Sequence, residues 1–138
     1  MFRWLHRVIL SLLLLCLVVI GCERKVSEMG KTQLAQWEDL RARRLPEGTM
    51  VSWSLQIWGF GDYHYSFRGM LAESPFYEVV CTLEDSRASP EKSQEIYKTI
   101  LSAAKNDWVR ARGRFRYVDD NGRVVIALED LQNLGPGH

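Results

Sequence analysis

The second half of the chain alternates apolar and polar residues, a pattern that predicts β-strands. From residue 50 the apolar side chains of three successive segments fall on every second position: Val51, Trp53, Leu55 and Ile57, then Tyr63, Tyr65, Phe67 and Leu71, then Tyr77, Val79, Cys81 and Leu83. A period of two places such residues on one face of a strand. Turn-forming residues separate the segments at residues 59–62 and 74–75. Three consecutive strands are therefore expected, each with one apolar face.

A helix and two further strands are predicted after residue 88. Ser89 and Pro90 are typical of a helix N-terminus, and apolar residues follow them at helical spacing. The strand pattern then returns in two segments, whose inward residues are expected to be Val109, Ala111, Gly113, Phe115 and Tyr117, and Val124, Ile126 and Leu128. Asn121-Gly122 lies between these segments and is typical of a tight hairpin turn, so the two strands should pair.

The predicted order of elements is three strands, one helix and two strands. This order resembles the OB-fold, a five-stranded Greek-key barrel with a helix between its third and fourth strands. The resemblance implies a mainly β fold, with the barrel at residues 48–134. Gly69 and Gly113 interrupt two of the strands, as happens where barrel strands bend. An unrelated α+β sheet with the helix on one face fits the same order.

Residues 22–47 are expected to form a tether and a short helix ahead of the barrel. The helix is predicted at residues 32–44, because Leu34, Trp37 and Leu40 recur at helical intervals and Pro46 ends the pattern. Two arrangements fit this segment: a helix packed on the barrel, or part of a stalk.

The first 21 residues have the features of an export signal. Arg3 and Arg7 flank the start of an apolar run at residues 8–20. This run is shorter than the about 20 apolar residues that a membrane-spanning helix needs, as in a signal peptide. It leads into the tetrad Val19-Ile20-Gly21-Cys22, which resembles the lipobox of bacterial lipoproteins.

The lipobox resemblance implies that the signal peptide, residues 1–21, is removed and that Cys22 carries diacylglycerol. In many bacteria a third acyl chain follows on its amino group, and two or three chains hold a protein firmly on a membrane. The expected location is therefore the cell envelope, and Glu23 favours the outer membrane if the cell is Gram-negative. An uncleaved signal anchor and a plain secreted protein are the alternatives.

Composition changes this picture little. The whole chain has 18 basic and 17 acidic side chains, and removal of Arg3 and Arg7 leaves 16 against 17, a net charge of −1. Such a balance does not indicate a polyanion partner. If Cys22 carries lipid, Cys81 has no cysteine partner in the mature chain, and we expect it to lie in the core.

Four arginines occupy alternate positions of the predicted fourth strand: Arg110, Arg112, Arg114 and Arg116. They should leave one face, about 6.6 Å apart, and guanidinium groups bind phosphate, sulfate and carboxylate. Two hairpin registers are open, which place either Arg114 or Arg112 opposite Glu129. In both, two or three of the arginines lack a cross-strand partner. An anion-binding row and a basic face without function both fit this pattern.

A second candidate group surrounds the first hairpin: Trp58, Phe60, Tyr63, His64 and Arg68. Ligands of OB-folds commonly meet the second and third strands and the loops after the first and fourth. Aromatic rings there can stack on bases, sugars or partner side chains. The alternative is that Tyr63 belongs to the core and Phe60 closes the barrel end.

Catalysis and metal binding find little support in the sequence. His64 and Cys81 are the one nucleophile–base pair of interest, and strand parity places them on opposite faces. His64, Cys81 and His138 lack the spacing of a metal site, so no enzyme activity, metal or cofactor is expected.

The function expected from these features is a lipid-anchored extracytoplasmic binding or assembly module for a partner protein or an anionic envelope polymer. The first hairpin and the arginine row would contact that partner. A single-stranded nucleic-acid-binding OB module is an alternative that export disfavours. A cell-envelope hydrolase is a further alternative, for which the sequence offers no catalytic residue.

Overall fold

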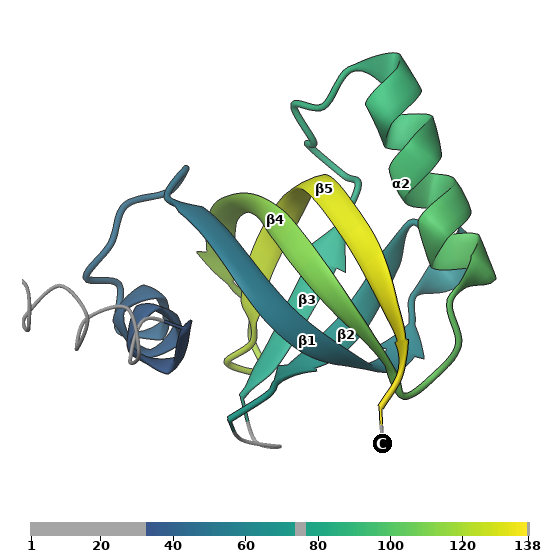
Figure 1. Ribbon diagram of the computed structural model, residues 1–138. Helices are drawn as coiled ribbons and strands as arrows, with labels where there is room; N and C mark the ends of the chain where they lie inside the picture. The colour runs from purple at the N-terminus through teal and green to yellow at the C-terminus, as the bar shows by residue number, and fades with distance from the viewer. Residues whose placement is uncertain (1–32, 74–76, 138) are drawn as a thin grey trace, which may run out of the picture. The chain divides into compact units, whose positions relative to one another are not determined.

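The strands close into a barrel in the computed structural model, which describes residues 33–73 and 77–137 (Figure 1). The elements are β1 (Met50–Phe60), the 3₁₀ turn η1 (Asp62–His64), β2 (Ser66–Leu71), β3 (Glu78–Thr82), α2 (Pro90–Ser102), β4 (Asp107–Val118) and β5 (Val124–Pro136). The leader and the proposed lipidation site Cys22 lie outside the described residues. Within those residues, no helix has the length and apolar character needed to cross a membrane.

The order of strands around the barrel is that of the OB-fold. The sequence of neighbours is β1-β2-β3-β5-β4, and β4 pairs back with β1 to close the barrel. The β3–β5 pair is parallel and the other pairs are antiparallel. This arrangement confirms the expected barrel, and it excludes the open α+β sheet because no strand edge is left unpaired along the ring.

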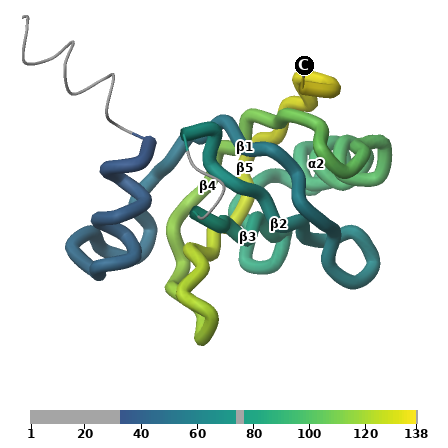
Figure 2. Tube along the Cα trace, turned by 90° about the horizontal axis from the view of Figure 1, so that it is seen from below, coloured from purple at the N-terminus to yellow at the C-terminus, as the bar shows by residue number. Residues whose placement is uncertain are grey.

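Alternation along the strands fills the barrel interior. Val51, Trp53, Leu55 and Ile57 of β1 are all buried, as the period of two predicts. Ile96 and Ile100 of α2 and Trp37 and Leu40 of the N-terminal helix (residues 33–41) join the same core. The two helices lie on opposite sides of the barrel (Figure 2). Their buried residues extend the core cluster beyond the strands.

The N-terminal helix packs on the barrel. Its Trp37 is buried and donates a hydrogen bond from Nε1 to the carbonyl oxygen of Glu78 (3.1 Å). The amide of Gln33 accepts from the backbone N–H of Ser54 and donates to the carbonyl oxygen of Ser54. Pairing of β1 with β2 extends only from Leu55, so the Gln33 amide satisfies backbone groups that β2 does not reach.

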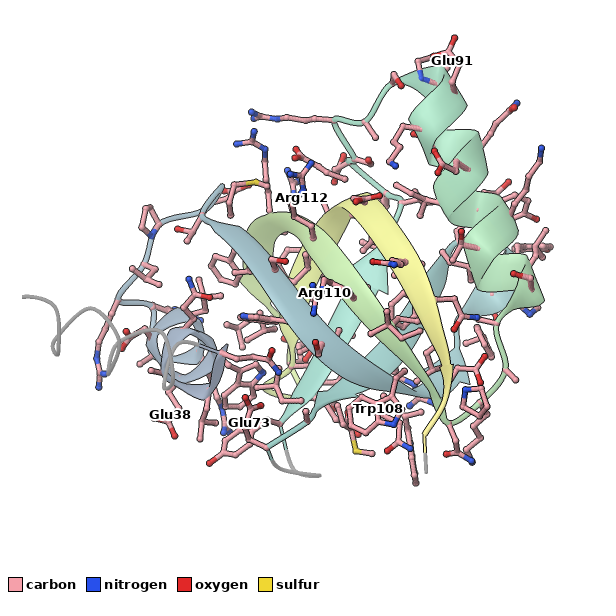
Figure 3. All side chains as sticks on the ribbon, viewed as in Figure 1. Glu38, Glu73, Glu91, Trp108, Arg110 and Arg112 are labelled. Atoms are coloured by element: carbon pink, nitrogen blue, oxygen red, sulfur yellow. The ribbon has the colours of Figure 1, made fainter. Side chains whose placement is uncertain are left out.

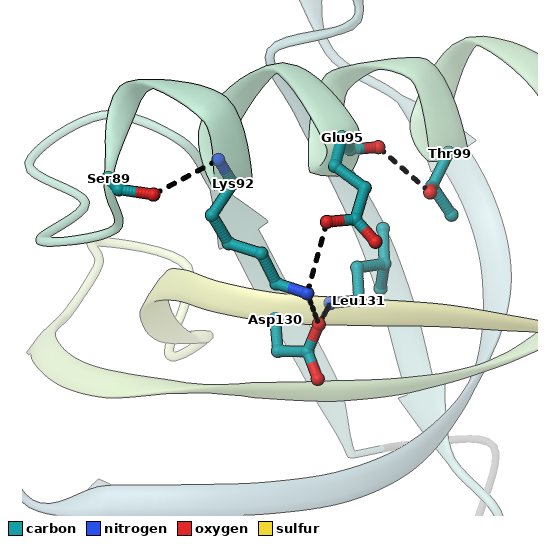
Figure 4. Close-up of polar contacts among 6 residues, drawn as sticks. All are labelled: Ser89, Lys92, Glu95, Thr99, Asp130 and Leu131. Carbon is teal, nitrogen blue, oxygen red and sulfur yellow. Dashed lines mark hydrogen bonds and ion pairs between the residues drawn. The ribbon is translucent and has the colours of Figure 1, made fainter.

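α2 begins where the sequence predicts and is tied to β5. The Ser89 hydroxyl accepts a hydrogen bond from the N–H of Lys92 (3.2 Å), which satisfies one of the unpaired donors of the first turn. Lys92 Nζ also forms ion pairs with Asp130 of β5 (2.7 Å) and with Glu95 (3.3 Å) (Figure 4). This network fixes the helix over the end of the barrel.

Two sequence predictions about strand residues are wrong. The second strand does not begin at Tyr63: residues 62–64 form η1, and Tyr63 and His64 have φ angles of 57° and 59°. Such left-handed residues cannot continue a strand, so β2 starts at Ser66. Tyr117 does not point inward but is 57% exposed, because the register between β4 and β5 shifts between Phe115 and Tyr117.

Candidate functional site

The structure divides the arginine row of β4 into two pairs. Arg114 and Arg116 are half-buried and paired with carboxylates, whereas Arg110 and Arg112 are exposed. Neither Arg110 nor Arg112 has an ion pair within 4.0 Å among the described residues. The expectation of two or three unpartnered arginines thus reduces to two.

A β-bulge explains why Arg114 is neutralised. Arg112 lies opposite Asp130 and Gly113 lies opposite Leu128, so Glu129 has no directly opposed residue. Its carboxylate accepts a hydrogen bond from Nε of Arg114 at 2.6 Å. Neither Arg114 nor Arg112 is directly opposed to Glu129, so both predicted registers are wrong at this residue, although Arg114 does pair with it. The predicted register that would place Arg112 opposite Glu129 holds from Gly113 to Phe115 and is lost at the bulge.

Arg116 is neutralised by residues far away in the sequence. Its guanidinium lies 3.0 Å from the carboxylate of Asp85 and 3.4 Å from that of Glu47. The register shift next to Arg116 leaves it without an opposed residue on β5, so its side chain turns to these two segments. Arg116 thus holds the loop after β3 and the segment before β1 against the barrel, and is less available to a ligand.

Arg110 and Arg112 point outward between β1 and β5 (Figure 3). Their neighbours across β1 are Ser54 and Ser52, which carry no charge. Across β5, Arg110 faces Gln132 and Arg112 faces Asp130.

Asp130 is already engaged by α2. The hydrogen bond and charge of Lys92 hold the pKa of the Asp130 carboxyl below its usual value, against the opposing effect of burial, and the charge of Arg112 makes a smaller contribution in the same direction. Positive charge therefore exceeds negative charge around Arg110 and Arg112.

Aromatic residues continue this surface along the same strands. Trp108 lies two residues before Arg110 on β4, so it shares the outward face, opposite Gln56 of β1 (Figure 3). Trp58 of β1 is 44% exposed, and Nζ of Lys105 lies 4.7 Å from its ring centroid, a cation–π distance. We define the basic face as Lys105, Arg110 and Arg112 with the two tryptophans, Trp58 and Trp108.

The residues predicted around the first hairpin do not form one site. Trp58 belongs to the basic face, whereas Phe60 is partly buried and packs against the core. Tyr63 is 82% exposed, so the alternative that placed it in the core is wrong. His64 lies beside Phe60, with ring centroids 5.2 Å apart. The Arg68 guanidinium lies over the backbone of Gly59, close enough that a side chain there would meet it.

Two members of the basic face were missed by sequence reasoning. Trp108 was detectable, because it has the same parity as Arg110 on the same strand. Lys105 follows α2 in the sequence, and only the fold brings it over Trp58, which comes 47 positions earlier. No local pattern could have indicated that contact.

Cys81 and His64 do not form a catalytic pair. Cys81 is fully buried inside the barrel, and burial raises the pKa of its thiol. His64 lies exposed in η1. Nor do three or more His, Cys, Asp or Glu side chains gather as metal ligands in the described part of the chain.

Solved structures share the barrel. OBody AM3L09 bound to hen egg-white lysozyme has a TM-score of 0.53 and 18% identity, over 70% of this chain and 93% of that chain. OBody AM1L10, also bound to hen egg-white lysozyme, has a TM-score of 0.49 and 18% identity, over 65% and 82%.

A mitochondrial single-stranded DNA-binding protein of S. cerevisiae, Rim1, has a TM-score of 0.41 and 14% identity, over 67% of this chain and 100% of that chain. No protein-family model and no curated protein matches the sequence. Of these likenesses, the one to OBody AM3L09 supports the barrel fold, and at 18% identity it carries no argument about a ligand.

Proposed function

We propose that this chain is a lipid-anchored binding module of the cell envelope, which holds an acidic partner protein or an anionic envelope polymer on its basic face. The anchor is the set of acyl chains that the lipobox resemblance implies on Cys22. The proposed role is binding without catalysis; the candidate nucleophile–base pair gives no support for catalysis, because Cys81 is buried and His64 is exposed.

The unequal pairing of the arginine row is the observation that carries this proposal. Arg114 and Arg116 have structural partners, whereas Arg110 and Arg112 are exposed and have no ion pair with another described residue. Even an exposed ion pair contributes only about 0–1 kcal/mol to stability, and Arg110 and Arg112 form none within 4.0 Å among the described residues. A contribution to folding stability therefore does not explain why two arginines stand on this face. Their guanidinium groups remain available to bind carboxylate or phosphate oxygens in a bidentate manner.

A charge-reversal pair with a matched control tests the basic face. The variant Arg110→Glu, Arg112→Glu changes the net charge by the same amount as Arg87→Glu, Lys98→Glu, whose exposed side chains lie elsewhere and have no ion pair among the described residues. Full chains are crosslinked in membranes, and captured components are identified. Loss of an acidic component in the first variant only supports the proposal, and an unchanged set of components refutes it.

A separate variant tests the anchor. Cys22→Ser should abolish incorporation of radiolabelled palmitate and release the protein from the membrane fraction. Equal labelling of the wild type and the variant would refute lipidation at this residue, whatever the outcome for the basic face.

Single-stranded nucleic acid is the second candidate ligand, because the two arginines lie on the same outward face as Trp58, and bases stack on exposed aromatic rings. Two phosphate contacts predict a slope of about −1.4 for the logarithm of the binding constant against that of salt concentration. Binding of an oligothymidylate with this slope, lost in Arg110→Glu, Arg112→Glu, would favour nucleic acid. Absence of binding at low salt would exclude it.

A further inference from the structure

A groove of about 750 Å³ opens between η1, the end of β3 and the first turns of α2. This volume is within the range of about 300–1,000 Å³ that is typical of ligand pockets. The groove shares no residue with the basic face. Its walls include the ring pair Tyr65 and Tyr97 and the two carboxylates of Asp62 and Glu84.

The charge of the groove has one sign. Asp62 and Glu84 are the charged residues among the described side chains that line it, and neither forms an ion pair with another described residue. Ser93 and Gln94 of α2 add uncharged polar groups to the wall. A ligand that enters the groove therefore meets two carboxylates that no lysine or arginine of the lining compensates.

The aromatic pair gives the groove a second recognition element. The rings of Tyr65 and Tyr97 stack with centroids 5.3 Å apart and an interplanar angle of 22°. Tyr65 is 55% exposed, so part of its ring is accessible from the groove. Aromatic faces attract ammonium and guanidinium groups, and nearby carboxylates strengthen the preference for a cation.

The backbone of the loop that carries Asp62 and Tyr65 is constrained. Tyr63 and His64 between them both adopt left-handed φ angles, which cost about 1–3 kcal/mol each in residues other than glycine. The carbonyl oxygen of Tyr65 accepts a hydrogen bond from the N–H of Leu83 at 2.9 Å, and this bond ties the loop to the chain after β3. The carboxylate of Asp62 and the ring of Tyr65 are thereby held at the same opening.

We infer that this acidic aromatic groove binds a lysine- or arginine-bearing segment of a partner polypeptide. Charge complementarity selects this occupant, because both charged groups of the groove are anionic and its aromatic ring face favours a cation. The volume of the groove, about 750 Å³, accommodates more than one side chain, which suits a peptide segment better than a single ammonium ion. The module then has two surfaces of opposite charge, and each acts independently of the other.

The test is calorimetric titration of the full chain in detergent micelles with a capped tetra-arginine peptide. The variant Asp62→Asn, Glu84→Gln keeps the shape of both side chains and removes both charges. Its control is Glu91→Gln, Asp120→Asn, which removes two exposed charges outside the groove. We expect the groove variant to weaken binding roughly tenfold or more and the control to bind like the wild type.

Three results would overturn the inference: no binding of the peptide to the wild type, equal weakening in both variants, or binding of neutral chitotetraose at the groove in place of the peptide. Arg110→Glu, Arg112→Glu should bind the peptide as the wild type does. The basic face and the groove can therefore fail separately.

Discussion

Gly113 in the middle of β4 provides a sharp test of how this barrel closes. A Cβ atom at this position would lie 2.6 Å from Cγ2 of Ile126 and 2.9 Å from the carbonyl carbon of Ala127, and closer still to the carbonyl oxygen of Ala127. Carbon atoms in favourable contact are about 3.5–4.0 Å apart. Gly113→Ala therefore forces β5 away from β4 at the bulge where the two strands meet.

The size of the effect follows from what obstructs the new methyl group. Overpacking costs about 1–3 kcal/mol, and the upper part of that range applies because backbone atoms held in a sheet obstruct it. A Gly-to-Ala change also restricts the unfolded chain, which returns about 0.4–1 kcal/mol. The net loss in the free energy of unfolding is about 2 kcal/mol, or roughly 8–16 °C in melting temperature for a domain of this size.

Gly59→Ala is the matched control. Gly59 also lies in a strand without a positive φ, but its added Cβ would meet the guanidinium group of Arg68, with the terminal nitrogen nearest at 3.1 Å. That nitrogen ends a flexible, exposed side chain, so the control should melt no lower than the wild type. Thermal and urea unfolding, followed by circular dichroism, compare the variants. If Gly113→Ala melts as high as Gly59→Ala, the close contact between β4 and β5 is wrong.

Two further predictions concern titratable groups. Burial raises the pKa of Asp119, but hydrogen bonds from the backbone and guanidinium of Arg123 outweigh it and lower the pKa. The pKa of Asp130 is lowered as well. Each of these two carboxylates therefore stabilises the folded state fully above the ordinary pKa of aspartate, about 4, and this stabilisation is lost as the pH falls through the pKa that the residue has in the folded protein. Melting temperature should fall below pH 4, and less steeply in Asp119→Asn; identical acid limbs would contradict this. Burial raises the pKa of the Cys81 thiol, so a maleimide should label Cys81 only after urea unfolding, as peptide mapping would show; labelling in the folded protein would contradict the buried position.

The sequence was sufficient for the fold because side-chain alternation and element order are local properties. Val51, Trp53 and Leu55 had to share a face, and Ser89 with Pro90 had to begin a helix. Local patterns failed where the backbone departs from regular geometry. Tyr63 alternates like a strand residue but adopts a left-handed φ in η1, and nothing in its immediate sequence marks that change.

The candidate site was predictable only in part, for the same reason. Strand parity determined that the four arginines of β4 leave one side of the barrel. Which of them are neutralised depends on bulges that shift Glu129 beside Arg114 and on the contacts of Asp85 and Glu47 with Arg116.

By itself, the sequence determined the order of the elements, most of their inward faces and the common face of the arginines, because these follow from the periodicity of the backbone. Only the tertiary structure decided that Arg110 and Arg112 form no ion pair within 4.0 Å among the described residues, that Lys105 covers Trp58, and that Asp62 and Glu84 share a groove with Tyr97. These pairings join residues distant in the chain, and barrel closure and strand register set their distances.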